Sequence, residues 1–425
     1  MTELAWIDAA VVAARPQAMA ALLRYFRDLD RAEEAYQEAC LRALSQWPGK
    51  GPPRDPAAWL IFVGRNAQLD GVRKQARLVA LPEEEQLSDL DDAEADMAER
   101  LDTSDYRDDV LRLLFICCHP EIPATQQIAL ALRIVSGLSV TQIARAFLVS
   151  DSAMEQRITR AKARIAKSPV PFEPPGPVER SERLVTVTTM IYLLFNEGYS
   201  ASEQPLAERA QFCDEALRLS RLLLRLFPME AEIMGFLALQ LLQHARLPAR
   251  YDAAGSLVLL EHQDRKLWNA GMIAEGLALI DKAMRHRTSG PYQVQAAIAA
   301  LHDRAETAEQ TDWAEIDQLY AALERMQPSP VVTLNRAVAV SKSRGAEAAL
   351  AMIEPLTEAL AGYFHFHGLK GALLLQLNRP LEARHALDKA ISLARSPVEA
   401  DHIRQKIDAL ADRHPVRRAA AQIPK

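Results

Sequence analysis

The sequence has few cysteines and aromatic residues, and it has no long hydrophobic run. Four cysteines among 425 residues are too few for a disulfide framework, which favours a reduced, cytoplasmic protein. No apolar stretch reaches the roughly 18–20 residues that cross a bilayer, so we expect no membrane association. The first residues include Glu3 and Asp8 but no basic leader, so a secretory signal is not expected.

Motifs for common enzyme chemistry are also missing. The sequence contains no P-loop, G-x-G-x-x-G, G-x-S-x-G or H-E-x-x-H pattern, so we expect neither an enzyme nor a cofactor. Cys117 and Cys118 are adjacent and point to different helix faces without a second pair, so they favour buried core positions over a metal site. With aromatics at only 6%, the Leu, Ala, Arg and Glu content predicts an all-α fold.

Charge is distributed unevenly along an acidic chain whose net charge is −6. Residues 79–109 contain 13 acidic and 2 basic side chains, whereas residues 110–168 contain 3 acidic and 8 basic ones. Five cations and no acid fall between Arg157 and Lys167. This asymmetry favours a nucleic-acid surface beside an acidic linker.

Proline, glycine and charge divide the chain into segments. In the first segment, Asp30 with Glu33 resembles a capping box for the next helix, and the Gly/Pro-rich stretch 47–56 predicts a turn. Five prolines in residues 168–179 argue against a helix there. The predicted domains are a helical block (1–78), an acidic linker (79–109), a basic helical domain (110–168), a proline-rich linker (169–182) and helical hairpins (183–425).

The basic domain contains the pattern of a helix-turn-helix. Ser139 and Gln142 form a capping box for a helix over Val140–Phe147. A short turn follows, and Ser150 or Asp151 caps the next helix.

The second helix of this pair has an apolar and a polar face. Met154, Ile158, Ala161 and Ile165 form one stripe. Such a helix can enter the major groove, where Gln and Arg pair with base edges while other cations neutralise phosphates. The alternative is a solvated surface helix within a bundle. The candidate DNA contacts are Ser152, Glu155, Gln156, Arg157, Thr159, Arg160, Lys162 and Arg164.

The C-terminal segment contains an internal repeat. Residues 337–356 and 372–391 align at an offset of 35, with turns at Arg344–Gly345 and Arg379–Pro380. Small residues and a near-34 period are typical of tetratricopeptide hairpins, which stack into a solenoid with a concave binding surface.

Three motifs, taken in order, resemble the extracytoplasmic-function sigma factors of bacterial RNA polymerase. "DLDRAEEAYQEACLRAL" (28–44) is similar to the core-polymerase-binding helix of that family. "AAWLIFVGRNAQLDGVRKQAR" (57–77) is similar to its promoter-melting helix, with Gly64 and Gly71 as departures. "LSVTQIARAFLVSDSAMEQRITRAKARI" resembles the helix-turn-helix that reads the −35 element. Residues 112–133 and 189–202 look like segments of the group with a tetratricopeptide-like extension.

The resemblance implies a role for each matching residue. Region 4 would bind the −35 element through the helix contacts above, and the acidic linker would run near the RNA exit path. Region 2 would bind core RNA polymerase at the beta-prime clamp, and region 4 would bind the beta flap. The implied −10 contacts are Arg65, Asn66, Asp70, Arg73, Lys74 and Arg77, and the implied polymerase contacts are Asp30, Glu33, Glu34, Gln37, Glu38 and Leu41.

Simpler alternatives exist for both sets of residues. The −10 residues could brace their own helix, and the acidic residues could form a solvated face. The whole chain could instead be a conventional helix-turn-helix regulator fused to a tetratricopeptide-type sensor, or a scaffold whose basic helix binds an acidic protein. The C-terminal domain would modulate activity through a small ligand or a protein partner.

Overall fold

The computed structural model of the chain is all-α, as predicted. It describes residues 5–51, 53–76, 103–119, 122–147, 149–167, 177–199, 206–252, 257–394, 400 and 403–404, and no β-strand occurs within these ranges. Most of the predicted acidic linker and part of the proline-rich linker lie outside them. No helix within these ranges is long and apolar enough to cross a membrane.

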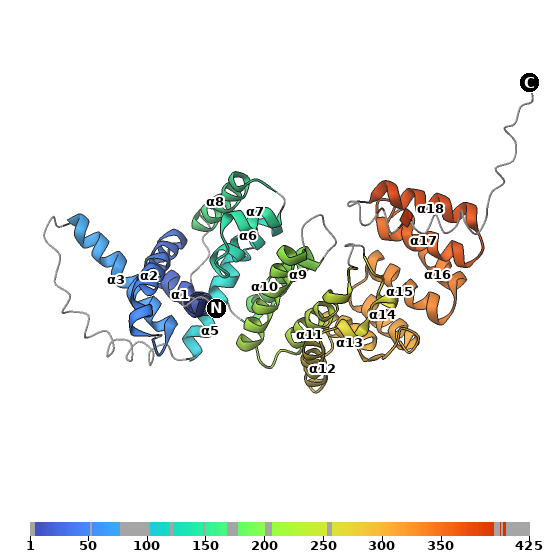
Figure 1. The fold of residues 1–425 in the computed structure, drawn as a ribbon, viewed down its shortest axis with the longest axis horizontal. Coiled ribbons are helices and arrows are strands. Elements are labelled where there is room, and N and C mark those ends of the chain that lie inside the picture. Colours follow the sequence, from blue (N-terminus) through green and yellow to red (C-terminus); the bar gives the residue numbers. More distant parts are fainter. Residues whose placement is uncertain are drawn as a thin grey trace, which may run out of the picture. The chain divides into compact units, whose positions relative to one another are not determined.

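The chain forms two compact units, and the boundary between them falls at Leu194. The first unit (Figure 1) contains α1 (Ala5–Phe26), α2 (Leu29–Lys50), α3 (Pro56–Ala76), α5 (Thr103–Cys117), α6 (Ala124–Ile134), α7 (Val140–Ala146), α8 (Asp151–Lys167) and most of α9 (Pro177–Tyr199). The second contains α10 (Leu206–Leu226), α11 (Ala231–Ala245), α12 (Ala270–Met284), α13 (Pro291–Arg304), α14 (Trp313–Met326), α15 (Pro330–Ser343), α16 (Ala346–Ile353), α17 (Phe364–Gln376) and α18 (Pro380–Leu393).

In the first unit, α1, α2 and α3 pack against one another, and α5 packs against α1. Apolar side chains at helical spacing on these helices pack together in a shared core. Trp47 lies edge-on to Trp59 with ring centroids 5.3 Å apart, and Tyr36 is fully buried. The helix α8 packs on both α6 and α7. Of the residues of α2 expected to face the core, Ala32, Ala39 and Ala43 are buried, whereas Leu44 is 49% exposed.

The start of α2 differs from the prediction. Its N-cap is Asp28, whose carboxylate accepts hydrogen bonds from the amides of Asp30 (2.9 Å) and Arg31 (3.0 Å). Arg27 has a positive φ of 53° and ends α1, which leaves Asp28 in the extended conformation that an N-cap requires. The predicted capping box at Asp30 and Glu33 is therefore wrong, and both side chains are available for other contacts.

Prolines interrupt fewer helices than predicted. Pro48 lies in the last turn of α2, which continues to Lys50. Loss of one backbone donor there is tolerated, and the amide of Gly51 (φ 81°) closes the helix on the Trp47 carbonyl at 2.8 Å. Pro177 occupies the first position of α9, where proline is favoured because its missing N–H would be unpaired in any case.

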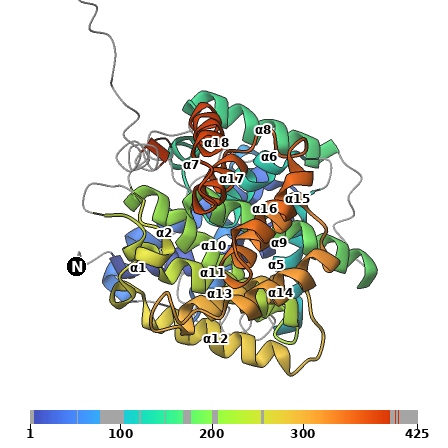
Figure 2. The same ribbon diagram turned by 90° about the vertical axis from the view of Figure 1, so that its right-hand side faces the viewer.

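The second unit is built of antiparallel helical hairpins. The helices α15 with α16 and α17 with α18 turn at Arg344–Gly345 and just before Pro380, as predicted, and α17 packs along α18 (Figure 2). The buried positions, however, repeat at an offset of 34 rather than 35. The corresponding buried pairs are Ala337 and Gly371, Ala339 and Leu373, Val340 and Leu374, Ala349 and Ala383, and Ile353 and Leu387.

Two glycines of α17 give opposite predictions for the same substitution. A Cβ at Gly371 would lie 2.6 Å from Leu387 Cδ2, whereas a Cβ at Gly368 would lie 3.6 Å from Ile403 Cδ1. Gly371→Ala should therefore destabilise the unit by about 1–3 kcal/mol through overpacking. Gly368→Ala should stabilise it by about 0.5–1 kcal/mol through helix propensity. Denaturant unfolding measures the free energy of unfolding of each variant. Equal changes in that free energy would contradict the packing around Gly371 and Gly368.

Candidate functional site

The predicted capping box at the start of α7 is present. The Ser139 amide donates to Gln142 Oε1 at 2.8 Å, and the Gln142 amide donates to Ser139 Oγ at 3.2 Å. The hydroxyl of Thr141 donates to Asp151 Oδ2 at 2.6 Å, which links the start of α7 to the start of α8. The N-cap of α8 is Ser150, whose hydroxyl accepts from the Ala153 amide at 3.3 Å. Residues 139–167 therefore form a helix-turn-helix.

The two faces of α8 are separated as the sequence predicts. Its buried residues are Met154, Ile158, Ala161 and Ile165. The exposed candidate DNA contacts are Ser152, Glu155, Gln156, Thr159, Arg160 and Arg164, and Arg157 is partly buried. A helix with its apolar stripe packed inward and Gln and Arg outward can present those side chains to a DNA groove.

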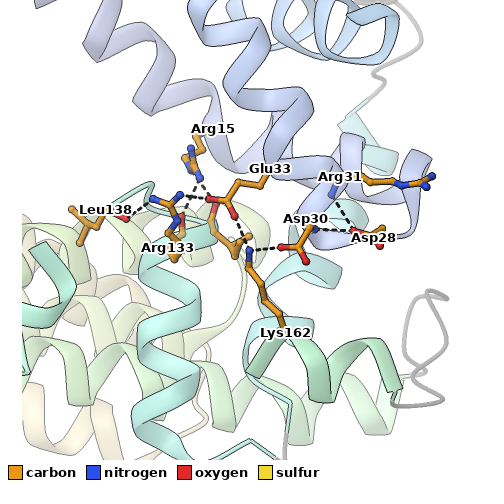
Figure 3. Close-up of polar contacts among 9 residues, drawn as sticks. Arg15, Asp28, Asp30, Arg31, Glu33, Arg133, Leu138 and Lys162 are labelled. Carbon is orange, nitrogen blue, oxygen red and sulfur yellow. Dashed lines mark hydrogen bonds and ion pairs between the residues drawn. The ribbon is translucent and has the colours of Figure 1, made fainter. Parts of the chain in front are cut away.

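Lys162 lies apart from the other candidate DNA contacts. Its ammonium group donates to Asp30 Oδ1 at 2.6 Å and to Glu33 Oε2 at 2.9 Å, both on α2 (Figure 3). Burial alone would lower the pKa of Lys162, but the hydrogen bonds to Asp30 and Glu33 outweigh it and raise that pKa. Lys162 is therefore charged and held by α2 instead of facing outward with Arg160.

The same carboxylate of Glu33 also meets a cation from α6. Arg133 Nη2 lies 2.6 Å from Glu33 Oε1, and the Glu33 side chain is only 7% exposed. The Glu33 carboxylate is thus placed between Arg133 and Lys162 (Figure 3). We call Asp30, Glu33, Arg133 and Lys162 the α2 ion cluster.

The predicted polymerase-binding residues of α2 separate into two groups. Asp30 and Glu33 belong to the α2 ion cluster. Glu34, Gln37 and Leu41 are exposed, while Glu38 is partly buried and pairs with Arg42 at 3.1 Å. At about 100° per residue, Asp30 lies on the same face of α2 as Gln37 and Leu41, and Glu33 lies at the edge of that face, so the ion cluster adjoins the exposed group.

The predicted −10 residues lie on α3, with one exception. Asn66 is partly buried, and the Arg65 guanidinium lies 4.3 Å from the centre of the Tyr25 ring, which braces α3 against α1. The backbone of α3 carries Asp70, Arg73 and Lys74, but their side chains are not among those described. Arg77 lies outside the described residues.

Arg15 is a buried cation on α1 that no sequence motif indicated. Its Nε donates to the Ile134 carbonyl at 3.0 Å and its Nη2 to the Arg133 carbonyl at 3.0 Å, across 119 and 118 residues of sequence. Its guanidinium also lies 4.7 Å from the centre of the Tyr36 ring. Burial lowers the pKa of Arg15 from its ordinary value. A cation placed among the apolar positions of α1 is the one signal that could have indicated this contact.

The α2 ion cluster predicts unequal effects for its two acids. Glu33→Gln should lower the local opening free energy of α8 by about 2 kcal/mol, because it removes the charge partner of Arg133 and leaves Lys162 with Asp30 alone. Asp30→Asn should lower it by less than about 0.5 kcal/mol, because the Asp30 carboxylate is 70% exposed. Hydrogen exchange of α8 peptides measures both. Equal losses would contradict the different burial of the two carboxylates.

Comparison with known proteins gives three family matches. Residues 11–78, which cover most of α1 and all of α2 and α3, match Sigma-70 region 2. Residues 112–165, from α5 to α8, match Sigma-70 region 4. Residues 183–284 match a family of unknown function, DUF6596.

A curated relative has the same extent as this chain. An uncharacterized protein of Rhizobium meliloti (strain 1021) is 69% identical over 411 residues, which cover 97% of each chain. No solved structure matches. Regions 2 and 4 occur in the order and on the helices that the sequence motifs indicated. The chain is therefore a sigma factor of the sigma-70 family, with core RNA polymerase and promoter DNA as its partners.

Proposed function

We propose that this sigma factor is of the extracytoplasmic-function type and reads the −35 element through α8. The observation that carries the proposal is the division of α8 into a buried apolar stripe and an exposed face. That face includes Gln156 and Arg160, whose side chain types can pair with base edges in the major groove, and Arg164, which would bind phosphate. Ser139 and Ser150 fix the starts of the two helices that would dock on the DNA.

The −10 element would be bound by α3. Asn66, Asp70 and Arg73 are spaced four and three residues apart on this helix, so they share one face. Such a face can hold an unstacked base while nearby cations follow the single-stranded backbone. Contacts of α2 with the polymerase clamp and of region 4 with the flap complete the proposed initiation complex.

The C-terminal unit would modulate initiation as a tetratricopeptide-like domain. Burial that repeats every 34 residues in α15–α18 supports this assignment, because 34 is the tetratricopeptide period. A cavity of about 310 Å³ in this unit is lined by Arg265, His302, Trp313, Tyr320, Asn335 and Lys342, among others. A cavity of this size favours a small ligand as the regulating signal.

Transcription in vitro tests the proposal directly. Core RNA polymerase from Rhizobium meliloti, incubated with the full-length protein and fragmented genomic DNA of that bacterium, should start RNA chains at a discrete set of sites. A conventional regulator would leave core polymerase unable to initiate without another sigma factor. A version that ends at Lys167 should initiate at the same sites but respond differently to ligands of the C-terminal unit.

Two arginines of α8 should affect promoters differently. Arg160→Ala should weaken initiation by the equivalent of about 1–3 kcal/mol at promoters with particular −35 bases and little at others. Arg164→Ala should weaken all promoters to a similar extent and reduce the magnitude of the log–log salt slope by about 1, from a slope near −4. Sequencing of run-off transcripts gives both results. Identical promoter profiles for the two variants would contradict the assignment of separate reading and anchoring roles.

A further inference from the structure

A long connection follows α11 in the second unit. Residues 246–269 run from the end of α11 to the start of α12 and contain three short 3-10 turns, Leu247–Ala249, Leu260–His262 and Arg265–Leu267. Loops longer than about 12–15 residues with little regular structure are uncommon in compact domains and often belong to functional sites. Residues 259–261 and Arg265 of this connection form one wall of the 310 Å³ cavity.

Two arginines fix the connection on α13. Arg246 Nε donates to Asp303 Oδ1 at 2.7 Å. Arg265 Nη1 donates to the carbonyls of His302 and of Ala305, the latter at 2.7 Å. Both bonds of Arg265 come from one nitrogen, so among the contacts of the described residues its Nε and Nη2 donors stay available to bind an anion. The fold thus places a cation at the cavity before any ligand arrives.

The other walls come from α14 and α15, which pack in order after α13 (Figure 1). The lining residues that share one face of each helix are Trp313, Ile316 and Tyr320 of α14 and Asn335, Val338 and Lys342 of α15. The His302 ring lies edge-on to the Trp313 ring, with centroids 5.1 Å apart. Aromatic side chains with this geometry form a wall against which a flat ring can pack.

The charge that lines the cavity is positive in sum. Arg265 and Lys342 line it, and Glu261 is the one acid among the described lining residues. Lys342 Nζ lies 2.8 Å from Glu261 Oε2 and 6.0 Å from the centre of the Trp313 ring. Burial and two nearby guanidinium groups lower the pKa of His302 to about 3, so its imidazole is neutral and adds no charge. The cavity therefore suits a ligand with one negative group.

The size of the cavity limits the ligand further. An engineered protein cavity of about 150 Å³ takes up one benzene ring. A cavity of about 310 Å³ has roughly twice that volume, enough for about two fused rings and a short polar group. A peptide of several residues is too large for it, which favours a small molecule.

We propose that this cavity binds a small aromatic carboxylate, whose rings pack against Trp313 and whose carboxylate is bound by Arg265 and Lys342. The inference rests on the proposed function for its effect on transcription, whereas binding itself is measured without polymerase. Arg265 belongs to the connection 246–269 and Lys342 belongs to α15. A ligand held by both cations therefore joins these two elements and favours the arrangement in which they lie close together.

Isothermal titration calorimetry of the full-length protein with 2-naphthoate tests the proposal. We expect a Kd on the order of 10–100 μM, within the range for a ligand of this size. The neutral 2-naphthamide and the aliphatic octanoate should each bind at least about tenfold more weakly, because one lacks the charge and the other lacks the rings. Equal affinity for 2-naphthamide overturns recognition of the carboxylate, and equal affinity for octanoate overturns recognition of the rings.

Two substitutions should change the affinity for 2-naphthoate in opposite directions. Lys342→Gln removes a cation and leaves Glu261 facing the ligand, so binding should weaken about three- to tenfold. Glu261→Gln removes the repelling acid, so binding should tighten about two- to fivefold. Lys282→Gln makes the same charge change at an exposed position of α12 outside the lining residues and should bind like the wild type. Equal weakening in Lys342→Gln and Glu261→Gln would show that their ion pair only supports the fold.

A bulky substitution tests the location of the site. Ala308 lines the cavity from the loop after α13, so Ala308→Trp should fill the space and abolish binding of 2-naphthoate. Ala361→Trp makes the same change at an exposed turn before α17 and is the matched control. Circular dichroism confirms that each variant keeps its helices. Wild-type affinity in a folded Ala308→Trp overturns the location.

Transcription with core polymerase from Rhizobium meliloti separates the inference from the proposed function. Selective binding of 2-naphthoate that also changes initiation by the full-length protein, but not by the version ending at Lys167, supports both. Selective binding without any change in initiation supports the site and overturns the regulatory role proposed for the C-terminal unit. Absence of binding to the wild type overturns the inference and leaves the sigma-factor assignment intact.

Discussion

The burial of one carboxylate, that of Glu33, constrains the whole arrangement of the first unit. A buried negative charge is costly unless cations and hydrogen bonds compensate for it. Arg133 and Lys162 supply that compensation from two different helices of region 4. Because both cations must reach the same carboxylate, α6 and α8 are fixed together against α2.

Helical geometry explains how α2 takes part in this contact without losing its whole outer face. Residues that differ by one position point about 100° apart, so Glu33 is buried while Glu34 is exposed. The face that continues through Gln37 and Leu41 stays accessible, next to the place where region 4 docks. The 22-residue helix α2 thus offers an internal surface and an external one that lie side by side.

The C-terminal unit follows a different physical rule. Its hairpins depend on small residues that let helices approach, such as Gly371 against Leu387 and Ala349 in the neighbouring hairpin. Buried positions of the α15–α16 hairpin recur at an offset of 34 in the α17–α18 hairpin. The sequence alignment at 35 matched residue types along the helices, but burial depends on the direction of each side chain, and only the three-dimensional packing reveals that direction.

The sequence by itself determined most features that depend on neighbouring residues, although the cap of α2 is Asp28 and not the predicted Asp30. The capping box at Ser139 and Gln142, the buried stripe of α8 and the hairpin turns all involve residues three or four positions apart, so periodicity and side-chain chemistry were sufficient. Only the tertiary structure decided which charged side chains pair inside the protein and which stay exposed to solvent. The partner of Lys162 is 129 residues away at Glu33 and that of Arg15 is 119 residues away at Ile134. No local pattern encodes such a pairing, because it arises only when packed helices bring a buried carboxylate or carbonyl within reach of a cation.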